Sequence, residues 1–156
     1  MIKKFLFTIL FTLVLSVGVF ANEVILECKF IKEVNTTYGK TKVYSAQELN
    51  SPIDLDTVFK INSKFKTIFS YNRYAEEFEP ISRDRKDFKL YWSDNEINWT
   101  YKNPILKGTS NTNSLNRNTG KFLQKLYINK TSELYKSTGT EYSESVSQCQ
   151  KRDKLF

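Results

Sequence analysis

The segment EVILECKF, residues 23–30, decides the fold class of this chain. The charged side chains Glu23, Glu27 and Lys29 fall on one face of an extended chain. The alternating apolar residues on the other face are Val24, Leu26, Cys28 and Phe30. Because successive side chains of a strand point to opposite faces, this period of two predicts a half-buried β-strand.

The same alternation recurs along the chain. Residues 88–92 and 97–101 both alternate, and the polar turn Ser93–Glu96 separates them, so we expect an antiparallel hairpin. Further strands are expected at Thr41–Ser45, Thr57–Ile61, Phe65–Tyr71, Lys121–Ile128, Glu133–Ser137 and Ser143–Lys151. Short helical turns are expected only at Ser45–Glu48 and Asn72–Glu79. The sequence therefore predicts an all-β fold, an antiparallel meander that closes into a small barrel or a sandwich, with at most one or two short helical turns.

NRNTGKF, residues 116–122, contains the Gly-Lys pair of a phosphate-binding loop. That loop needs an earlier glycine where this chain has Leu115, and a Ser or Thr where it has Phe122. Asn118-Thr119-Gly120 instead matches a type I turn followed by a left-handed glycine. We therefore expect a hairpin turn.

The N-terminus has the layout of a secretory signal peptide. Two lysines precede an apolar run at residues 5–20, and the small residue Ala21 follows. We expect residues 1–21 to be removed, which leaves residues 22–156 as a single β domain without a transmembrane segment, periplasmic or secreted. A membrane anchor retained at the same run is the rival interpretation, because the run is only slightly shorter than a bilayer span.

The chain has two cysteines, Cys28 near the start of the expected mature protein and Cys149 near its end. In an oxidising compartment such a pair in one domain is expected to form a disulfide. The alternative, a redox-active or nucleophilic thiol, lacks both the Cys-x-x-Cys spacing and a histidine that would activate a thiolate.

The chain contains no histidine. This excludes Ser-His-Asp and Cys-His catalysis and the common zinc sites, and we expect neither a metal nor a cofactor. A hydrolase would have to use carboxylates, which are densest between Glu76 and Asp87. Their alternation with basic residues is typical of a solvated loop, so the chain is expected not to be an enzyme.

The charge of the expected mature chain is mildly basic. Removal of Lys3 and Lys4 leaves 22 of the 24 basic residues against 17 acidic ones, a net charge of +5. Because the two signs are interspersed, a solvated surface is the simplest interpretation, and attraction to anionic lipids or envelope polymers is the alternative. An exported protein is not expected to bind nucleic acid.

Three residues are candidates for binding. Arg117, just before the expected turn, could offer a bidentate fork to a carboxylate or phosphate, or could stack on a cross-strand aromatic ring. Trp92 and Trp99 could line a ligand cavity or fill the core of a small barrel.

The order of these features resembles that of small exported bacterial β-proteins. Cys28 stands in the first strand, residues 116–121 form an Arg-x-Thr-Gly-type turn, and Cys149 precedes a basic tail that ends in Phe156. The likeness spans most of the mature chain and implies an exported β domain, but no activity. A terminal-strand disulfide on a small barrel is also similar to periplasmic lysozyme inhibitors, although this chain lacks their Ser-Gly loop before the central aromatic strand.

These observations predict a non-enzymatic binding domain. Its expected partner is an envelope protein, an envelope polymer or a small apolar ligand. The alternatives are a carboxylate-based hydrolase and a protein like the lysozyme inhibitors. A cavity or an exposed aromatic patch would favour binding, and two carboxyl groups facing each other across a cleft would favour the hydrolase.

Overall fold

The computed structural model describes residues 23–49 and 55–152. The predicted signal peptide, residues 1–21, lies outside these ranges. The elements of the described chain are β1 (Glu23–Thr37), β2 (Lys40–Ser45), β3 (Thr57–Asn62), β4 (Thr67–Asn72), β5 (Glu77–Pro80), β6 (Lys86–Trp92), β7 (Glu96–Lys102), β8 (Thr109–Asn116), β9 (Lys121–Ile128), α2 (Glu133–Thr138) and β10 (Thr140–Arg152).

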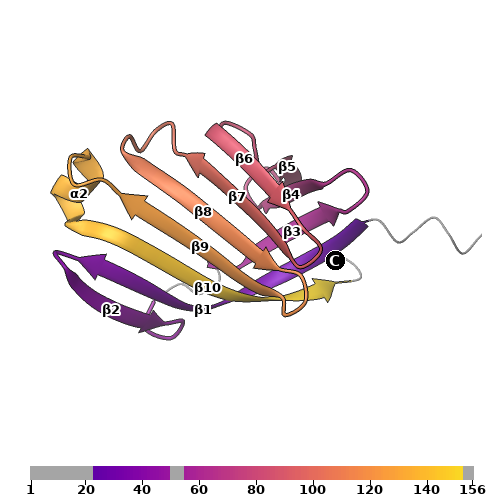
Figure 1. Cartoon of the computed structure of the whole chain (residues 1–156). Coiled ribbons are helices and arrows are strands. Elements are labelled where there is room, and N and C mark those ends of the chain that lie inside the picture. Colours follow the sequence, from indigo (N-terminus) through magenta and orange to yellow (C-terminus); the bar gives the residue numbers. More distant parts are fainter. Residues whose placement is uncertain (1–22, 50–54, 153–156) are drawn as a thin grey trace, which may run out of the picture.

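All of these strands belong to one antiparallel sheet (Figure 1). The order across the sheet is β5-β4-β3-β1-β10-β9-β8-β7-β6, and β2 pairs with the second half of β1. The sheet curls into a half-barrel with one concave and one convex face (Figure 1). The predicted all-β antiparallel meander is therefore confirmed, as is the hairpin of β6 and β7.

The first and last strands, β1 and β10, are neighbours in the middle of the sheet. From this pair the sheet extends through β3 and β4 to β5 on one side, and through β9, β8 and β7 to β6 on the other. The two edges of this path, β5 and β6, follow each other in the sequence. We call the opening between the unpaired edges β5 and β6 the seam of the half-barrel. It lies between two consecutive strands and not at the chain ends.

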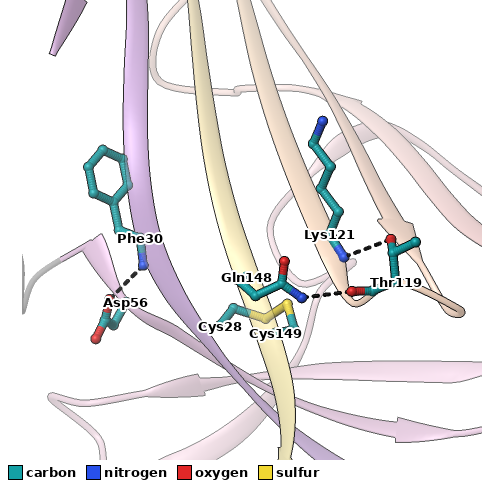
Figure 2. Close-up of a disulfide and its surroundings, with 7 residues drawn as sticks. All are labelled: Cys28, Phe30, Asp56, Thr119, Lys121, Gln148 and Cys149. Carbon is teal, nitrogen blue, oxygen red and sulfur yellow. Dashed lines mark hydrogen bonds between the residues drawn. A yellow bond between two sulfur atoms is a disulfide. The ribbon is translucent and has the colours of Figure 1, made fainter. Parts of the chain in front are cut away.

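The predicted disulfide is confirmed and joins directly opposed residues of β1 and β10 (Figure 2). The backbone N–H of Cys149 donates to the carbonyl oxygen of Gly120 at 2.8 Å, away from β1. The two cysteines therefore form a pair without mutual backbone hydrogen bonds, the arrangement in which opposed side chains lie closest. Cys28 is 0% and Cys149 5% exposed, so the bridge is part of the core.

The turn predicted within residues 116–122 is confirmed as the connection between β8 and β9. The Asn116 side-chain oxygen accepts the N–H groups of Asn118 and Thr119 at 3.1 and 2.8 Å. Gly120 has the left-handed φ of 69°. The side-chain amide of Gln148 donates to the Thr119 carbonyl at 2.7 Å (Figure 2), so the turn is held against β10.

The core lies on the concave face around the disulfide. Aromatic rings from three strands meet there: Phe59 lies edge-on to Trp99 and Phe122, with ring centroids 5.7 and 5.1 Å apart, and Trp99 stacks on Phe122 at 5.7 Å. The buried core residues are Cys28, Phe59, Ile61, Ile68, Ile81, Ile97, Trp99, Leu115, Phe122 and Cys149.

The strand predicted at Glu133–Ser137 is wrong, because this segment is the helix α2. The Ser132 side chain accepts the N–H of Tyr135 at 3.1 Å and caps the N-terminus of the helix. Gly139, at φ 69°, ends it in the left-handed conformation. These two caps select a helical turn over the extended form that the alternating side chains favour.

The helical turn predicted at Asn72–Glu79 is also wrong. The Asn72 side-chain oxygen accepts the N–H groups of Tyr74 and Ala75 at 2.9 and 3.2 Å, which forms a local turn instead of a helix. Glu76 has a positive φ of 54°, and the chain then returns as β5. The segment is therefore the loop and second strand of a hairpin.

Within the residues that the structure describes, no helix combines the length and the apolar character that a membrane crossing needs.

Candidate functional site

Strand β8 gives the concave face an unusual polar lining. Its inward residues are Thr109, Asn111, Asn113 and Leu115, all of them at most 8% exposed. This strand is not predicted from the sequence, because its inward positions are mostly polar and carry no apolar alternation. A buried polar strand face is uncommon, because buried polar groups need hydrogen-bond partners. The face is therefore a candidate for contact with a polar ligand.

A cavity of about 190 Å³ opens on this face. Three of its residues, Trp99, Asn113 and Gln124, lie side by side across β7, β8 and β9 because the register pairs Trp99 with Asn113 and Asn113 with Gln124. The lining residues are Thr57, Phe59, Ser70, Arg85, Trp99, Tyr101, Asn113, Phe122 and Gln124.

The apolar part of the lining is aromatic. Phe59, Trp99 and Phe122 are at most 4% exposed and already pack against one another. Their mutual packing fixes their rotamers, so this side of the cavity is preformed. A preformed aromatic floor suits the flat or apolar part of a small ligand.

Arg85 is the only charged residue in the lining and comes from the connection between β5 and β6. Ile81, 3% exposed, anchors this connection in the core, and its N–H donates to the Ile68 carbonyl at 3.2 Å. The Arg85 guanidinium then lies over the ring of Tyr101, with its central carbon 4.1 Å from the ring centroid. The segment that connects β5 and β6 thus places the positively charged guanidinium of Arg85 on the concave face.

Among the described residues, no carboxylate forms an ion pair with Arg85, and its guanidinium makes no hydrogen bond but lies over the ring of Tyr101. Burial lowers the pKa of Arg85 below its ordinary value, and only the electrostatic interaction with Tyr101 opposes this shift. A half-buried guanidinium with unused donors has lost hydration without gaining an anion. An anion placed in the cavity would restore the missing partner.

The neutral polar groups of the cavity have spare hydrogen-bonding capacity. The Asn113 amide, 2% exposed, donates one long bond of 3.4 Å to the Trp99 carbonyl. In the described part of the chain, the side chains of Thr57, Ser70 and Gln124 have no hydrogen-bond partner in the protein. The lining contains no Asp, Glu, Cys or Lys, so it offers binding groups but no carboxylate base.

The three predicted binding residues lie in two places. Trp99 lines the cavity. Arg117 instead lies 5.8 Å from the ring centroid of Trp92 and donates to the carbonyl oxygens of Ser93 and Asp94 at 3.1 and 3.2 Å. The N–H donors of Arg117 thus join the β8–β9 connection to the β6–β7 connection.

Sequence reasoning missed Arg85. It stands in the run Arg83-Asp84-Arg85-Lys86-Asp87, whose charge alternation is typical of a solvated loop. Arg83 does pair at the surface, with Glu79 at 2.9 Å, whereas Arg85 turns inward. The buried Ile81, four residues earlier, was the one available signal that this loop packs on the core.

Three of the acids considered for a hydrolase form ion pairs at the surface. Glu77 and Glu79 both approach Arg83, at 3.9 and 2.9 Å, and Asp87 pairs with Lys102 at 2.7 Å. Within the described ranges, no group of three or more His, Cys, Asp or Glu residues is placed to hold a metal ion.

Comparison of the chain with protein-family models, with curated proteins and with solved structures finds no match.

Proposed function

We propose that this chain is a non-catalytic binding domain that takes a small ligand with an anionic group in its concave cavity. The observation that carries the proposal is Arg85, a half-buried guanidinium that faces the cavity with no carboxylate partner in the described chain. An anion would accept its hydrogen bonds in the bidentate geometry that arginine offers.

The rest of the lining supports a small ligand. The cavity of about 190 Å³ is smaller than the roughly 300 Å³ at which sites for drug-sized ligands begin. It therefore accommodates a compact acid or the acidic end of a longer molecule. The amides of Asn113 and Gln124 would bind the polar atoms, and the aromatic floor would bind the apolar ones.

A calorimetric titration tests the proposal with four probes: acetate, benzoate, glucuronate and inorganic phosphate. We expect at least one of them to bind the wild-type protein, and Arg85→Gln to weaken that binding about tenfold or more, as the loss of a charged hydrogen bond does. Arg83→Gln is the matched control, because Arg83 lies two residues away and pairs at the surface. Binding that survives Arg85→Gln, or the absence of binding to all four probes, would contradict the proposal.

We further propose that the domain acts after export, in the periplasm or outside the cell. The disulfide supports this, because such bonds persist in oxidising compartments, and so does the leader-like sequence of residues 1–21. N-terminal sequencing of protein from the periplasm or medium should give a chain that starts at Asn22. A chain recovered only from the cytoplasm with Met1 in place would contradict export.

A further inference from the structure

The connection between β7 and β8, residues 103–108, exposes apolar side chains at one end of the sheet. Ile105 is 86% and Leu106 40% exposed. The loop is nevertheless held firmly: the Asn103 side-chain oxygen accepts the N–H groups of Ile105 and Leu106 at 2.9 and 3.0 Å. The Asn129 N–H also donates to the Gly108 carbonyl at 2.9 Å. The apolar tip is therefore presented in a fixed conformation.

A basic cleft of about 600 Å³ adjoins this tip. Its charged lining residues are Lys86, Lys102, Lys107 and Glu141, a net charge of +2. Lys102 pairs with Asp87, but no carboxylate of the described residues pairs with Lys86 or Lys107. The register places Lys86 directly opposite Lys102. The two positive charges are therefore close together, and Asp87 neutralises only one of them.

The floor of the cleft is largely apolar. Tyr127, 46% exposed, and Ile128 of β9 line it together with Pro104. The combination is an exposed apolar tip, an apolar floor and a rim of lysines. Exposed apolar side chains beside lysines match the boundary between lipid headgroups and acyl chains, where both kinds of group are stabilised.

We propose that the β7–β8 connection and the adjoining lysine cleft dock on the surface of a membrane rich in anionic phospholipid. Ile105 and Leu106 enter the headgroup boundary, and the ammonium groups of Lys86 and Lys107 contact lipid phosphates. The charge complementarity of the cleft selects this partner over a neutral surface. This surface is separate from the cavity that contains Arg85, so either proposal can hold without the other.

Sedimentation with lipid vesicles tests the docking, with protein purified from an oxidising compartment. We expect binding to vesicles of phosphatidylcholine mixed with phosphatidylglycerol, and much weaker binding to pure phosphatidylcholine. The double variant Lys86→Gln, Lys107→Gln should bind the anionic vesicles about 25-fold more weakly, at about fivefold for each lysine near the surface. Ile105→Ser with Leu106→Ser should weaken binding by about tenfold or more.

Phe65→Ser is the matched control. Phe65 is 68% exposed and also lies between two lysines, Lys64 and Lys66, but in the β3–β4 turn. This variant should bind as the wild-type protein does. Absence of binding by the wild-type protein, or an equal loss in the control, would overturn the proposal.

Insertion of the tip has its own readout. A tryptophan introduced by Ile105→Trp should be quenched by brominated acyl chains in anionic vesicles, whereas one introduced by Phe65→Trp should not. Neither substitution is expected to lower the stability of the protein, because both side chains are exposed. Equal quenching of the two variants would place the contact elsewhere and overturn the assignment.

Discussion

The backbone around Gly120 leaves no room for a side chain. Its φ is 69°, and a Cβ there would collide with the carbonyl oxygen of Cys149. Gly39 has a similar φ of 72° but open space around it. Gly39→Ala therefore isolates the cost of the left-handed conformation, while Gly120→Ala adds the collision beside the disulfide.

We expect Gly39→Ala to lower the free energy of unfolding by about 1 kcal/mol and Gly120→Ala to lower it by about 3 kcal/mol, since the added carbon meets backbone that cannot move cheaply. Urea unfolding monitored by tryptophan fluorescence measures both. Equal losses in the two variants would show that the collision is relieved and that only the φ angle matters.

Arg117 is expected to stabilise the fold and not to contact the ligand. Its guanidinium joins two carbonyl oxygens to the ring of Trp92, so Arg117→Ala should lower the free energy of unfolding by about 1 kcal/mol. Arg117→Lys should lower it nearly as much, because an ammonium lacks the planar fork. Anion binding should be unchanged in both variants. A stable Arg117→Ala protein that no longer binds the anion would contradict this assignment.

At the scale of elements, apolar alternation sufficed where a strand has one apolar face and one polar face. It predicted β9 at its observed bounds and the β6–β7 hairpin. It failed for β8, whose inward positions include Asn111 and Asn113, because the pattern assumes that the buried face is apolar. It also failed for α2, where the Ser132 and Gly139 caps decide the conformation. The β8 failure arises because tertiary structure buries polar side chains, whereas the α2 failure arises because local capping outweighs the alternation of apolar residues.

The pairing of β1 with β10 is expected to depend on the disulfide. The bridge closes a sequence separation of 121 residues, and in the simplest chain-entropy model a loop of that length contributes about 4–5 kcal/mol. Cys28→Ser with Cys149→Ser, or a reductant, should therefore lower the melting temperature by many degrees. The reductant should leave the double variant unchanged. Two titratable thiols in the native, unreduced protein would contradict the bridge.

At the scale of the whole molecule, the sequence indicated only part of the site. The neighbouring terminal strands followed from the two cysteines, and Trp99 was a candidate from its place in an aromatic strand. Arg85 could not be found this way, because the seam between β5 and β6 exists only once the sheet has curled. That seam brings a residue from a charged loop next to β7 and the aromatic floor.

The core of the half-barrel also explains why the fold is stable although Arg85 has no ion-pair partner among the described residues. The core around the disulfide supplies most of the apolar burial, so the fold tolerates one desolvated cation at its rim. If Arg85 serves ligand binding and not folding, its removal should not weaken the empty protein, because replacing an uncompensated buried charge with an apolar side chain is neutral or stabilising.

The most direct test of the binding-domain account is the urea unfolding of Arg85→Met in the absence of any added anion. Methionine keeps the apolar contact with Tyr101 and removes the charge. If Arg85 serves an anionic ligand, the free energy of unfolding of Arg85→Met should equal that of the wild-type protein or be up to about 1 kcal/mol higher. A decrease of more than about 1 kcal/mol would show that Arg85 holds the fold together, and would contradict its assignment to an anionic ligand.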